Sequence, residues 1–470
     1  KELKNLFLLI ASIAFYALSD YDMLWLLITI IVANYLLALL TEAIREHIVL
    51  KRIALFLILL VNFGILYYYK YLLFTVDNIN ALFHTSITLQ SIALPVGISF
   101  ITFRSVSYCV DVYWGTCTAE RNPLNVGLYI AFFPQVTMGP ITKFNEFQSQ
   151  LHERAFLMEN LEDGAKRIIL GLAKKLILAN QLGVVVDKIF LMQDSDRTVL
   201  AAWIGIIGYL LQLYYDFAGY SDIAIGLGKL FGFQTPENFS YPYASKSVAD
   251  YWARWHMTLG AWLKDYIYVP VFRMCNSKEL PLLRKKISFQ AADYIALFAV
   301  WTFSGFWHGA AWNFILFGYY YCFFIILERI RDNRAKARRK RLKLKKQPET
   351  KWQAARAHIC TFSVIIFGQL LFRVEHASDF IPYIGSMFGA SGLISNTESF
   401  YIWNQIGILF VLAAVFATPL LQKCRKIMDA YVIPNRVDRV LTPATYLALL
   451  ILTLSFVFTD TYQSFIYFQF

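Results

Sequence analysis

The fold of this chain is decided by residues 290–328, QAADYIALFAVWTFSGFWHGAAWNFILFGYYYCFFIILE. Two apolar arms of about 17 residues flank the stretch Ser304–Ala311, which holds His308 between glycines at 305 and 309. As a helix, each arm is about 25 Å long, against a bilayer hydrocarbon core of about 30 Å. We therefore predict a helical hairpin whose tip, carrying His308, lies inside a membrane.

Basic residues flank the open end of this predicted hairpin. Arg284–Lys286 precede it, and the run RIRDNRAKARRKRLKLKKQPETK follows it at residues 329–351. Lys and Arg in short loops mark the cytoplasmic side of a membrane protein. We therefore predict that the hairpin opens to the cytosol and that His308 lies in the outer half of the membrane. Residues 329–351 are expected to form a solvated basic cytoplasmic loop, which can also lie against anionic headgroups.

The composition extends this interpretation to the whole chain. Of its 470 residues, 58% are hydrophobic and only 16% are charged, whereas soluble domains carry about 25% charged residues. Apolar segments long enough to be membrane helices occur at 5–19, 22–41, 52–70, 92–112, 125–140, 166–186, 199–231, 290–306, 309–328, 358–373, 404–421 and 443–459. The segment at 125–140 contains Pro134 and Pro140 and is expected to be short, interrupted or re-entrant. We predict an all-α, multi-pass membrane protein that forms one domain over residues 1–470.

Charge and cysteine content argue against several kinds of protein. The net charge of +12 comes without the aromatic or fold signature of a nucleic-acid-binding protein, so no nucleic acid partner is expected. The six cysteines are scattered and form no CxxC pair, so we expect neither a disulfide framework nor a metal site, and no permanently bound cofactor. Because the chain starts with Lys1 and no cleavable signal pattern follows, we expect it to begin partway into a longer protein.

The stretch DYWARWHMTLGAWLKD, residues 250–265, lies in the polar segment 235–289, expected on the cytosolic side as an amphipathic or re-entrant element. At 100° per residue it plots as one amphipathic helix. Trp255 falls on the apolar face, His256 at the edge of that face and Arg254 on the polar face. The pattern fits either an ordinary interfacial helix or a histidine that points into the protein.

A second polar stretch, QLYYDFAGYSD at residues 212–222, interrupts a long apolar segment. Ionisable side chains at membrane depth are costly and are commonly functional. Gln212 and Asp216 are four residues apart and share a helical face, whereas Asp222 points elsewhere. Together with Tyr220, these residues either line an internal passage or fix the helix bundle through hydrogen bonds between helices.

These histidines, carboxylates and tryptophans suit three classes of function. An acyltransferase would use His308 as the general base on a hydroxyl, and a proton-coupled membrane transporter would use the carboxylates and histidines as relays. A membrane glycan polymerase or flippase is the third class. Inverted repeats would favour a transporter, and a carboxylate-rich cytosolic domain would favour a polymerase, but the sequence shows neither. The residues by themselves leave the choice open.

Motifs spread over nearly the whole chain resemble the membrane-bound O-acyltransferase (MBOAT) family, and within it the branch of the alginate O-acetylation membrane protein. Each motif is weak, but their order and joint presence are specific. They are KNLFLLIASIAFY at 4–16, LPVGISF at 94–100, FFPQ at 132–135 with GP at 139–140, GLAKK at 171–175, residues 212–232, ENFSYPY at 237–243, residues 252–268, GFWHGAAW at 305–312, and FIYFQF at 465–470.

The resemblance implies a ring of about 11–12 membrane helices around a thin centre, with opposed funnels that meet near a catalytic histidine. The family pairs the histidine of a WHG segment with an earlier histidine or asparagine, and His308 and His256 match those positions. His308 would be the general base, acting as a neutral imidazole in apolar surroundings. His256 would orient the donor carbonyl or hydrogen-bond the developing oxyanion. Trp255, Trp262, Trp307 and Trp312 would shape the passage and exclude water.

The acetylating branch also implies the substrates. Acetyl-CoA is expected as the cytosolic co-substrate, with its phosphates near basic residues such as Arg254. The expected acceptor is a hydroxyl of an extracellular polysaccharide or cell-wall glycan, reached directly or through a separate extracytoplasmic acetyltransferase. The lipid bilayer of the bacterial cytoplasmic membrane is the implied location. A related branch shares the WHG and RWH elements and transfers D-alanine from a carrier protein to teichoic acid, which is the alternative.

Overall fold

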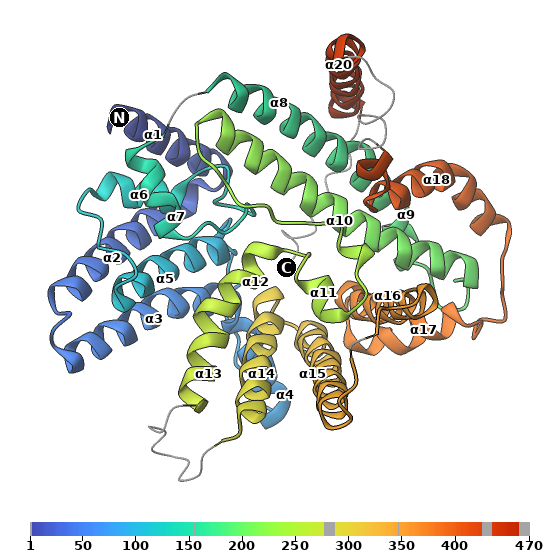
Figure 1. The fold of residues 1–470 in the computed structure, drawn as a ribbon, viewed down its shortest axis with the longest axis horizontal. Coiled ribbons are helices and arrows are strands. Elements are labelled where there is room, and N and C mark those ends of the chain that lie inside the picture. The colour runs from blue at the N-terminus through green and yellow to red at the C-terminus, as the bar shows by residue number, and fades with distance from the viewer. Residues whose placement is uncertain (1, 155–156, 277–286, 346, 425–434, 460–470) are drawn as a thin grey trace. The chain divides into compact units, whose positions relative to one another are not determined.

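The computed structural model describes residues 2–154, 157–276, 287–345, 347–424 and 435–459 (Figure 1). The predicted basic flank Arg284–Lys286 and the motif at 465–470 lie outside these residues. Every regular element in the described ranges is a helix, which confirms the all-α prediction. Contacts divide the chain into two compact units, residues 1–168 with 220–237, and residues 169–219 with 238–470. Each unit is described by itself.

The first unit contains seven complete helices, most of an eighth and the last turns of α10. They are α1 (Glu2–Ser19), α2 (Leu24–Ala43), α3 (Ile48–Lys70), α4 (Leu72–Phe83), α5 (Ile98–Trp114), α6 (Pro123–Ala131), α7 (Phe144–His152) and α8 (Met158–Ala173), with the 3-10 turn Tyr21–Met23 before α2. In Figure 1, α2, α3 and α5 lie side by side, and α5 contacts both of the others. The predicted segment 125–140 is interrupted, because α6 ends at Ala131 and turns follow it.

The core of the first unit encloses a charged side chain. Arg104 on α5 is 1% exposed. Its guanidinium lies 4.5 Å from the ring centroid of Tyr129 and 5.7 Å from that of Phe147. Stacking on aromatic faces compensates part of the cost of burying the cation. In the same unit α8 packs closely on α10, because a Cβ on Gly226 would lie 2.7 Å from the carbonyl oxygen of Gly164.

The second unit continues α8 through a π-helical turn and holds the other helices of the described ranges. They are the π-helical turn Lys174–Ala179, α9 (Asn180–Phe190), α10 (Val199–Leu230), the 3-10 turn Pro242–Ala244, α11 (Val248–Trp252), α12 (Met257–Leu263), the π-helical turn Lys264–Tyr268, α13 (Val269–Asn276), α14 (Phe289–His308), α15 (Trp312–Arg341), α16 (Lys351–Arg373), the 3-10 turn Ala377–Asp379, α17 (Phe380–Met387), α18 (Thr397–Phe416) and α20 (Asn435–Thr459).

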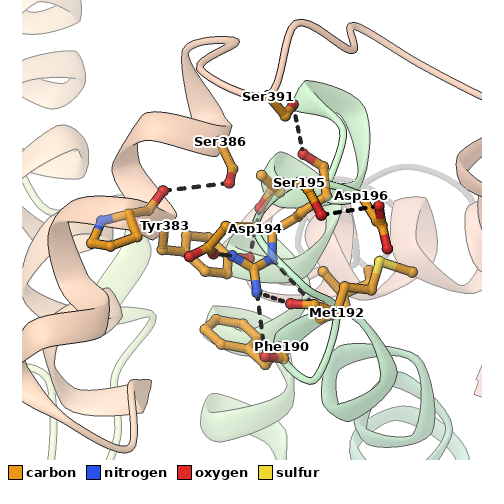
Figure 2. Close-up of polar contacts among 12 residues, drawn as sticks. Phe190, Met192, Asp194, Ser195, Asp196, Tyr383, Ser386 and Ser391 are labelled. Carbon is orange, nitrogen blue, oxygen red and sulfur yellow. Dashed lines mark hydrogen bonds and ion pairs between the residues drawn. The ribbon is translucent and has the colours of Figure 1, made fainter.

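One buried guanidinium, that of Arg197, fastens the connection between α9 and α10. Figure 2 labels its neighbours Phe190, Met192, Asp194 and Tyr383. The guanidinium donates to the carbonyl oxygens of Phe190 at 3.4 Å and Met192 at 2.5 Å, and to the carboxylate of Asp194 at 2.6 Å. It also lies 4.5 Å from the ring centroid of Tyr383 on α17. The last carbonyls of α9, which lack helical partners, are thereby satisfied, and the start of α10 is held in place.

Helices α14 and α15 form the predicted hairpin, with a turn of only three residues, 309–311. Their close approach depends on glycine. A Cβ on Gly318 would lie 2.5 Å from the carbonyl oxygen of Trp301, and a Cβ on Gly305 would lie 2.8 Å from that of Phe314. The prediction of a basic loop over 329–351 is wrong for its first half, because α15 continues to Arg341. Alanine, arginine and lysine favour helix, and cations stabilise a helix C-terminus.

Nine helical stretches in the described ranges are long and apolar enough to cross a membrane, which agrees with the predicted multi-pass protein. The number is lower than the dozen segments predicted from hydrophobicity. For example, α5 has 17 residues and α6 has 9, and α14 is not among the nine. The single domain over residues 1–470 and the ring with opposed funnels stay predictions.

Candidate active site

His308 is the last residue of α14 and lies at the tip of the hairpin. Its side chain is buried, with 6% exposure. The centroid of its ring lies 5.3 Å from that of Phe317 and 5.0 Å from that of Phe372, both edge-on. The Trp307 ring is 4.6 Å away. Aromatic rings on several sides therefore fix the orientation of the imidazole.

His256 interrupts the helix that was predicted over 250–265, and that prediction is wrong. α11 ends at Trp252, α12 begins at Met257, and His256 between them has a left-handed backbone with φ 45° and ψ 53°. A residue other than glycine in this backbone conformation lowers the stability of the fold by about 1 kcal/mol or more. The conformation persists only where the surrounding contacts hold it. His256 is 2% exposed, so it does point into the protein.

Asn238 holds His256 in this conformation. Its Oδ1 accepts hydrogen bonds from His256 Nδ1 at 3.0 Å, from Thr258 Oγ1 at 2.9 Å and from the Thr258 backbone N–H at 3.3 Å. A backbone N–H can only donate, so the amide atom facing His256 is the oxygen. His256 must therefore carry its proton on Nδ1.

The protonation of His256 follows from this contact and from its burial. Burial lowers the pKa of His256 to about 3 from its ordinary value of 6.5, because the apolar surroundings disfavour the charged form. The ring is therefore neutral at physiological pH. With the single proton on Nδ1, Nε2 of His256 is a hydrogen-bond acceptor.

His256 and His308 line one cavity of about 440 Å³. One wall of this cavity is a single face of α14, whose lining residues are Leu297, Val300, Trp301, Ser304 and His308. From Leu297 to His308 the helix rises about 16 Å. The cavity is therefore elongated and runs along α14, with His308 at one end of this face.

Charged residues lie toward the other end of the cavity. Arg329 lines it, and its Nη1 is 3.5 Å from the carboxylate of Asp293 near the start of α14. Asp293 also accepts a hydrogen bond from the hydroxyl of Tyr268 at 2.5 Å. Lys264, which is exposed, lines the cavity as well. The cavity thus has charged side chains toward one end and the imidazole of His308 at the other.

The four tryptophans predicted for the passage differ in their placement. Trp262 is 2% exposed and does not line the cavity. Trp255 is 3% exposed and lines the cavity. The Trp307 ring lies 6.0 Å from that of His256 and 4.6 Å from that of His308, although it is not among the lining residues. Trp312 is the first residue of α15, is 56% exposed and does not line the cavity.

Three of the predicted polar residues lie in the second unit and do not line the cavity. Arg254 donates to the carboxylate of Asp250 at 2.8 Å. Asp216 on α10 forms a buried ion pair with Lys175 of the preceding π-helical turn. Gln212 is buried, with 2% exposure. The contact of Asp216 favours the interpretation in which this polar stretch fastens one helix to another.

Tyr220 and Asp222 lie in the first unit and also make contacts between elements. The hydroxyl of Tyr220 is hydrogen-bonded to that of Thr137. Asp222 accepts from Arg167 Nε at 2.6 Å, and Arg167 Nη1 donates to Glu237 at 2.8 Å. These ion pairs connect α8 to α10 and to the segment that follows α10.

Sequence reasoning missed several residues of the site. Asn238 lies in the ENFSYPY motif, which supported the family resemblance but was given no role. Ser304 precedes His308 by four residues, so helical periodicity places it on the same face. Trp301 and Arg329 had no local signal, because only the packing of the hairpin brings them to the cavity.

Comparisons with known proteins agree with the resemblance. The family model described as MBOAT, membrane-bound O-acyltransferase family, matches residues 119–341. This range contains His256 and His308. The chain is 32% identical to a probable alginate O-acetylase of Pseudomonas putida, over 99% of this chain and 94% of that protein. It is 28% identical to a peptidoglycan O-acetyltransferase of Helicobacter pylori, over 99% and 91%. It is 30% identical to a teichoic acid D-alanyltransferase of Bacillus subtilis, over 59% and 68%.

Proposed function

This chain belongs to the membrane-bound O-acyltransferase family, and we propose that it transfers an acetyl group from acetyl-CoA to a hydroxyl of a glycan across a bacterial cytoplasmic membrane. The acceptor is an extracellular polysaccharide or cell-wall glycan, reached directly or through an extracytoplasmic acetyltransferase partner. The observation that carries the proposal is the single elongated cavity lined by both His256 and His308. The similarity to the probable alginate O-acetylase of Pseudomonas putida and to the peptidoglycan O-acetyltransferase of Helicobacter pylori supports acetyl transfer to a glycan.

The shape of the cavity suits a thioester at the end of a long, thin arm. The phosphates of CoA would stay near Arg329 and Lys264, while the pantetheine arm follows the α14 face toward His308. The wall along this path is mostly aliphatic and aromatic, which keeps water away from the thioester and limits its hydrolysis.

In the proposed reaction His308 is the general base. It takes the proton of the acceptor hydroxyl as that oxygen forms a bond to the carbonyl carbon of the thioester. When the tetrahedral intermediate collapses, the carbon–sulfur bond breaks and the departing thiolate takes the proton from His308. The products are an acetyl ester and free CoA, and the imidazole returns to its neutral form.

His256 acts as a positioning group in this scheme. Its Nδ1 donates to Asn238, so Nε2 can accept but cannot donate while the ring is neutral. The expected hydrogen bond from His256 to an oxyanion therefore fits less well. An acceptor at Nε2 can instead hold an N–H or O–H donor of a substrate, such as an amide of the pantetheine arm.

D-alanyl transfer to teichoic acid is the second candidate, favoured by the 30% identity to the enzyme of Bacillus subtilis. The two functions differ in the donor, because the alternative takes its acyl group from a carrier protein. An assay that offers both donors separates them.

The test incubates membranes that contain the protein with labelled acetyl-CoA and candidate glycans, and in parallel with D-alanyl carrier protein. We expect His308→Ala to lower acetyl transfer by about 10²-fold or more, the usual contribution of a general base, with unchanged membrane insertion. The control is His47→Ala, because His47 is exposed and makes no side-chain capping bond. Full acetyl transfer by His308→Ala would exclude this mechanism, and transfer from the carrier protein alone would select the second candidate.

A further inference from the structure

A second cavity, of about 580 Å³, lies between α15 and α16 and includes neither histidine of the candidate active site. Both helices are among the stretches able to cross a membrane, and they contact each other. Figure 1 shows them side by side. We call this cavity the α15/α16 groove, and the residues that define it are Phe324, Leu327, Arg331, Arg334, Arg356 and Val364.

The α15/α16 groove changes from apolar to basic along its length. On α15 the lining goes from Phe324 to Arg334, a rise of about 15 Å. On α16, which runs back along α15, the lining goes from Arg356 to Val364, about 12 Å. The cations of both helices therefore lie at the same end of the groove, and the apolar residues lie toward the other end.

The cations of the groove exceed the carboxylates that could neutralise them. Arg334 and Arg356 form no ion pair with any residue in the described ranges. Lys246 is paired with Glu349 at 2.8 Å. Glu328 accepts hydrogen bonds from two backbone amides at the start of α11, at 2.8 and 3.1 Å. An anion at the basic end would thus find two exposed guanidinium groups that are not otherwise engaged.

We propose that the α15/α16 groove binds one anionic phospholipid. The phosphate lies between Arg334 and Arg356, and one acyl chain follows the apolar part past Phe324 and Val364. Basic pockets between membrane helices bind anionic headgroups in this way. The phosphate matches the basic end of the groove, and the acyl chain matches its apolar end. This site is independent of the proposed acetyl transfer.

A cysteine in the groove provides the assay. Cys360 lines the groove and is exposed, and Cys424 is exposed and lies outside it. The protein is purified in a neutral detergent, and maleimide labelling of each thiol is followed by peptide mass spectrometry. We expect phosphatidylglycerol to slow labelling of Cys360 at least five-fold and to leave Cys424 unchanged. Phosphatidylcholine at the same mole fraction should protect neither thiol.

Charge-removing variants locate the headgroup. Each basic side chain near a lipid headgroup raises the binding affinity about five-fold, which corresponds to about 1 kcal/mol. The double variant Arg334→Gln, Arg356→Gln should therefore need about thirty-fold more phosphatidylglycerol for half-protection of Cys360. The matched control is Lys336→Gln with Lys351→Gln, which removes the same charge from the other faces of the same two helices.

Three results would overturn the proposal. The first is equal protection by phosphatidylcholine, which would make the groove an unselective detergent or lipid contact. The second is unchanged protection by phosphatidylglycerol in the double variant. The third is stronger protection of Cys360 by CoA than by phosphatidylglycerol at equal concentration, which would make the groove a nucleotide site.

Discussion

Replacing Asn238 with alanine is expected to disable the site, because one amide oxygen organises the break between α11 and α12. The substitution removes the acceptor of His256 Nδ1 and of the Thr258 backbone N–H, both buried. Each unsatisfied buried donor costs about 1–3 kcal/mol, so the loop loses about 2–6 kcal/mol of local stability. That loss is enough to release His256 from its left-handed conformation. We expect the rate of acetyl transfer to fall by about 10²-fold, which corresponds to about 3 kcal/mol.

Asn238→Asp tests whether the site needs the hydrogen-bond acceptor for His256 or the asparagine itself. The carboxylate has nearly the same shape and still accepts from His256 Nδ1. The new carboxylate favours the charged imidazolium, so it raises the pKa of His256 from its depressed value of about 3. We expect burial to keep that pKa below 7, so the rate at pH 7 should remain within about tenfold of wild type.

Thr258→Val is the matched control, because it removes one donor to Asn238 and leaves the bond to His256 in place. We expect it to lower the melting temperature with little effect on the rate. Acetyl transfer from labelled acetyl-CoA and the melting temperature are measured for all three variants between pH 6 and 8. A normal rate in Asn238→Ala, or a rate in Asn238→Asp as low as in Asn238→Ala, would refute control of the His256 tautomer by Asn238.

Gly318→Ala should destabilise the purified protein by about 1–3 kcal/mol, since its Cβ would lie 2.5 Å from a backbone carbonyl of α14. In the control Gly64→Ala, the new Cβ would have no neighbouring atom within 4 Å. This substitution should raise the melting temperature, because alanine favours helix. Asp216→Asn should destabilise the protein by about 3–5 kcal/mol, because it removes the carboxylate charge that pairs with the buried Lys175. Replacing that pair by Leu and Met should recover most of the yield and melting temperature. Because the folded pKa of His256 is about 3 and its ordinary value is 6.5, the unfolded state binds more protons between those values. Lowering the pH from 6.5 to 4.5 should therefore lower the free energy of unfolding by about 2 kcal/mol. Thermal unfolding at several pH values measures this loss, which should be absent in His256→Gln.

The helices of this chain were predictable where one local pattern dominates. The long span predicted at 199–231 is α10, Val199–Leu230, and the hairpin around His308 forms as expected. Hydrophobic length and basic flanks carry that information without any tertiary contact. The error at 329–351 has the same origin. The charge pattern was interpreted as a loop signal, although alanine, lysine and arginine are strong helix formers and no proline occurs between residues 329 and 347.

The candidate site was less predictable, because its geometry depends on contacts distant in sequence. The residues around His256 include no glycine or proline between 250 and 259, so periodicity favours one continuous helix there. The structure breaks that helix because Asn238, 18 residues earlier, offers its side-chain oxygen to His256 and its backbone carbonyl to the Met257 N–H. Asp216 was equally ambiguous, since its partner Lys175 is 41 residues away.

The break at His256 is stable because the hydrogen bonds that maintain it outweigh its backbone cost. Three hydrogen bonds converge on Oδ1 of Asn238, the carbonyl of Asn238 accepts from the Met257 N–H at 2.9 Å, and the Ser240 N–H donates to the carbonyl of Arg254 at 3.0 Å. At about 1 kcal/mol each, these five bonds exceed the 1–3 kcal/mol cost of the left-handed residue. Hence the segment is rigid, and the imidazole is presented to the cavity from a fixed backbone. His308 is fixed differently, by the end of α14 and the rings around it. The two imidazoles that line the cavity are thus set by separate elements, so a substitution such as Asn238→Ala should move His256 and leave His308 in place.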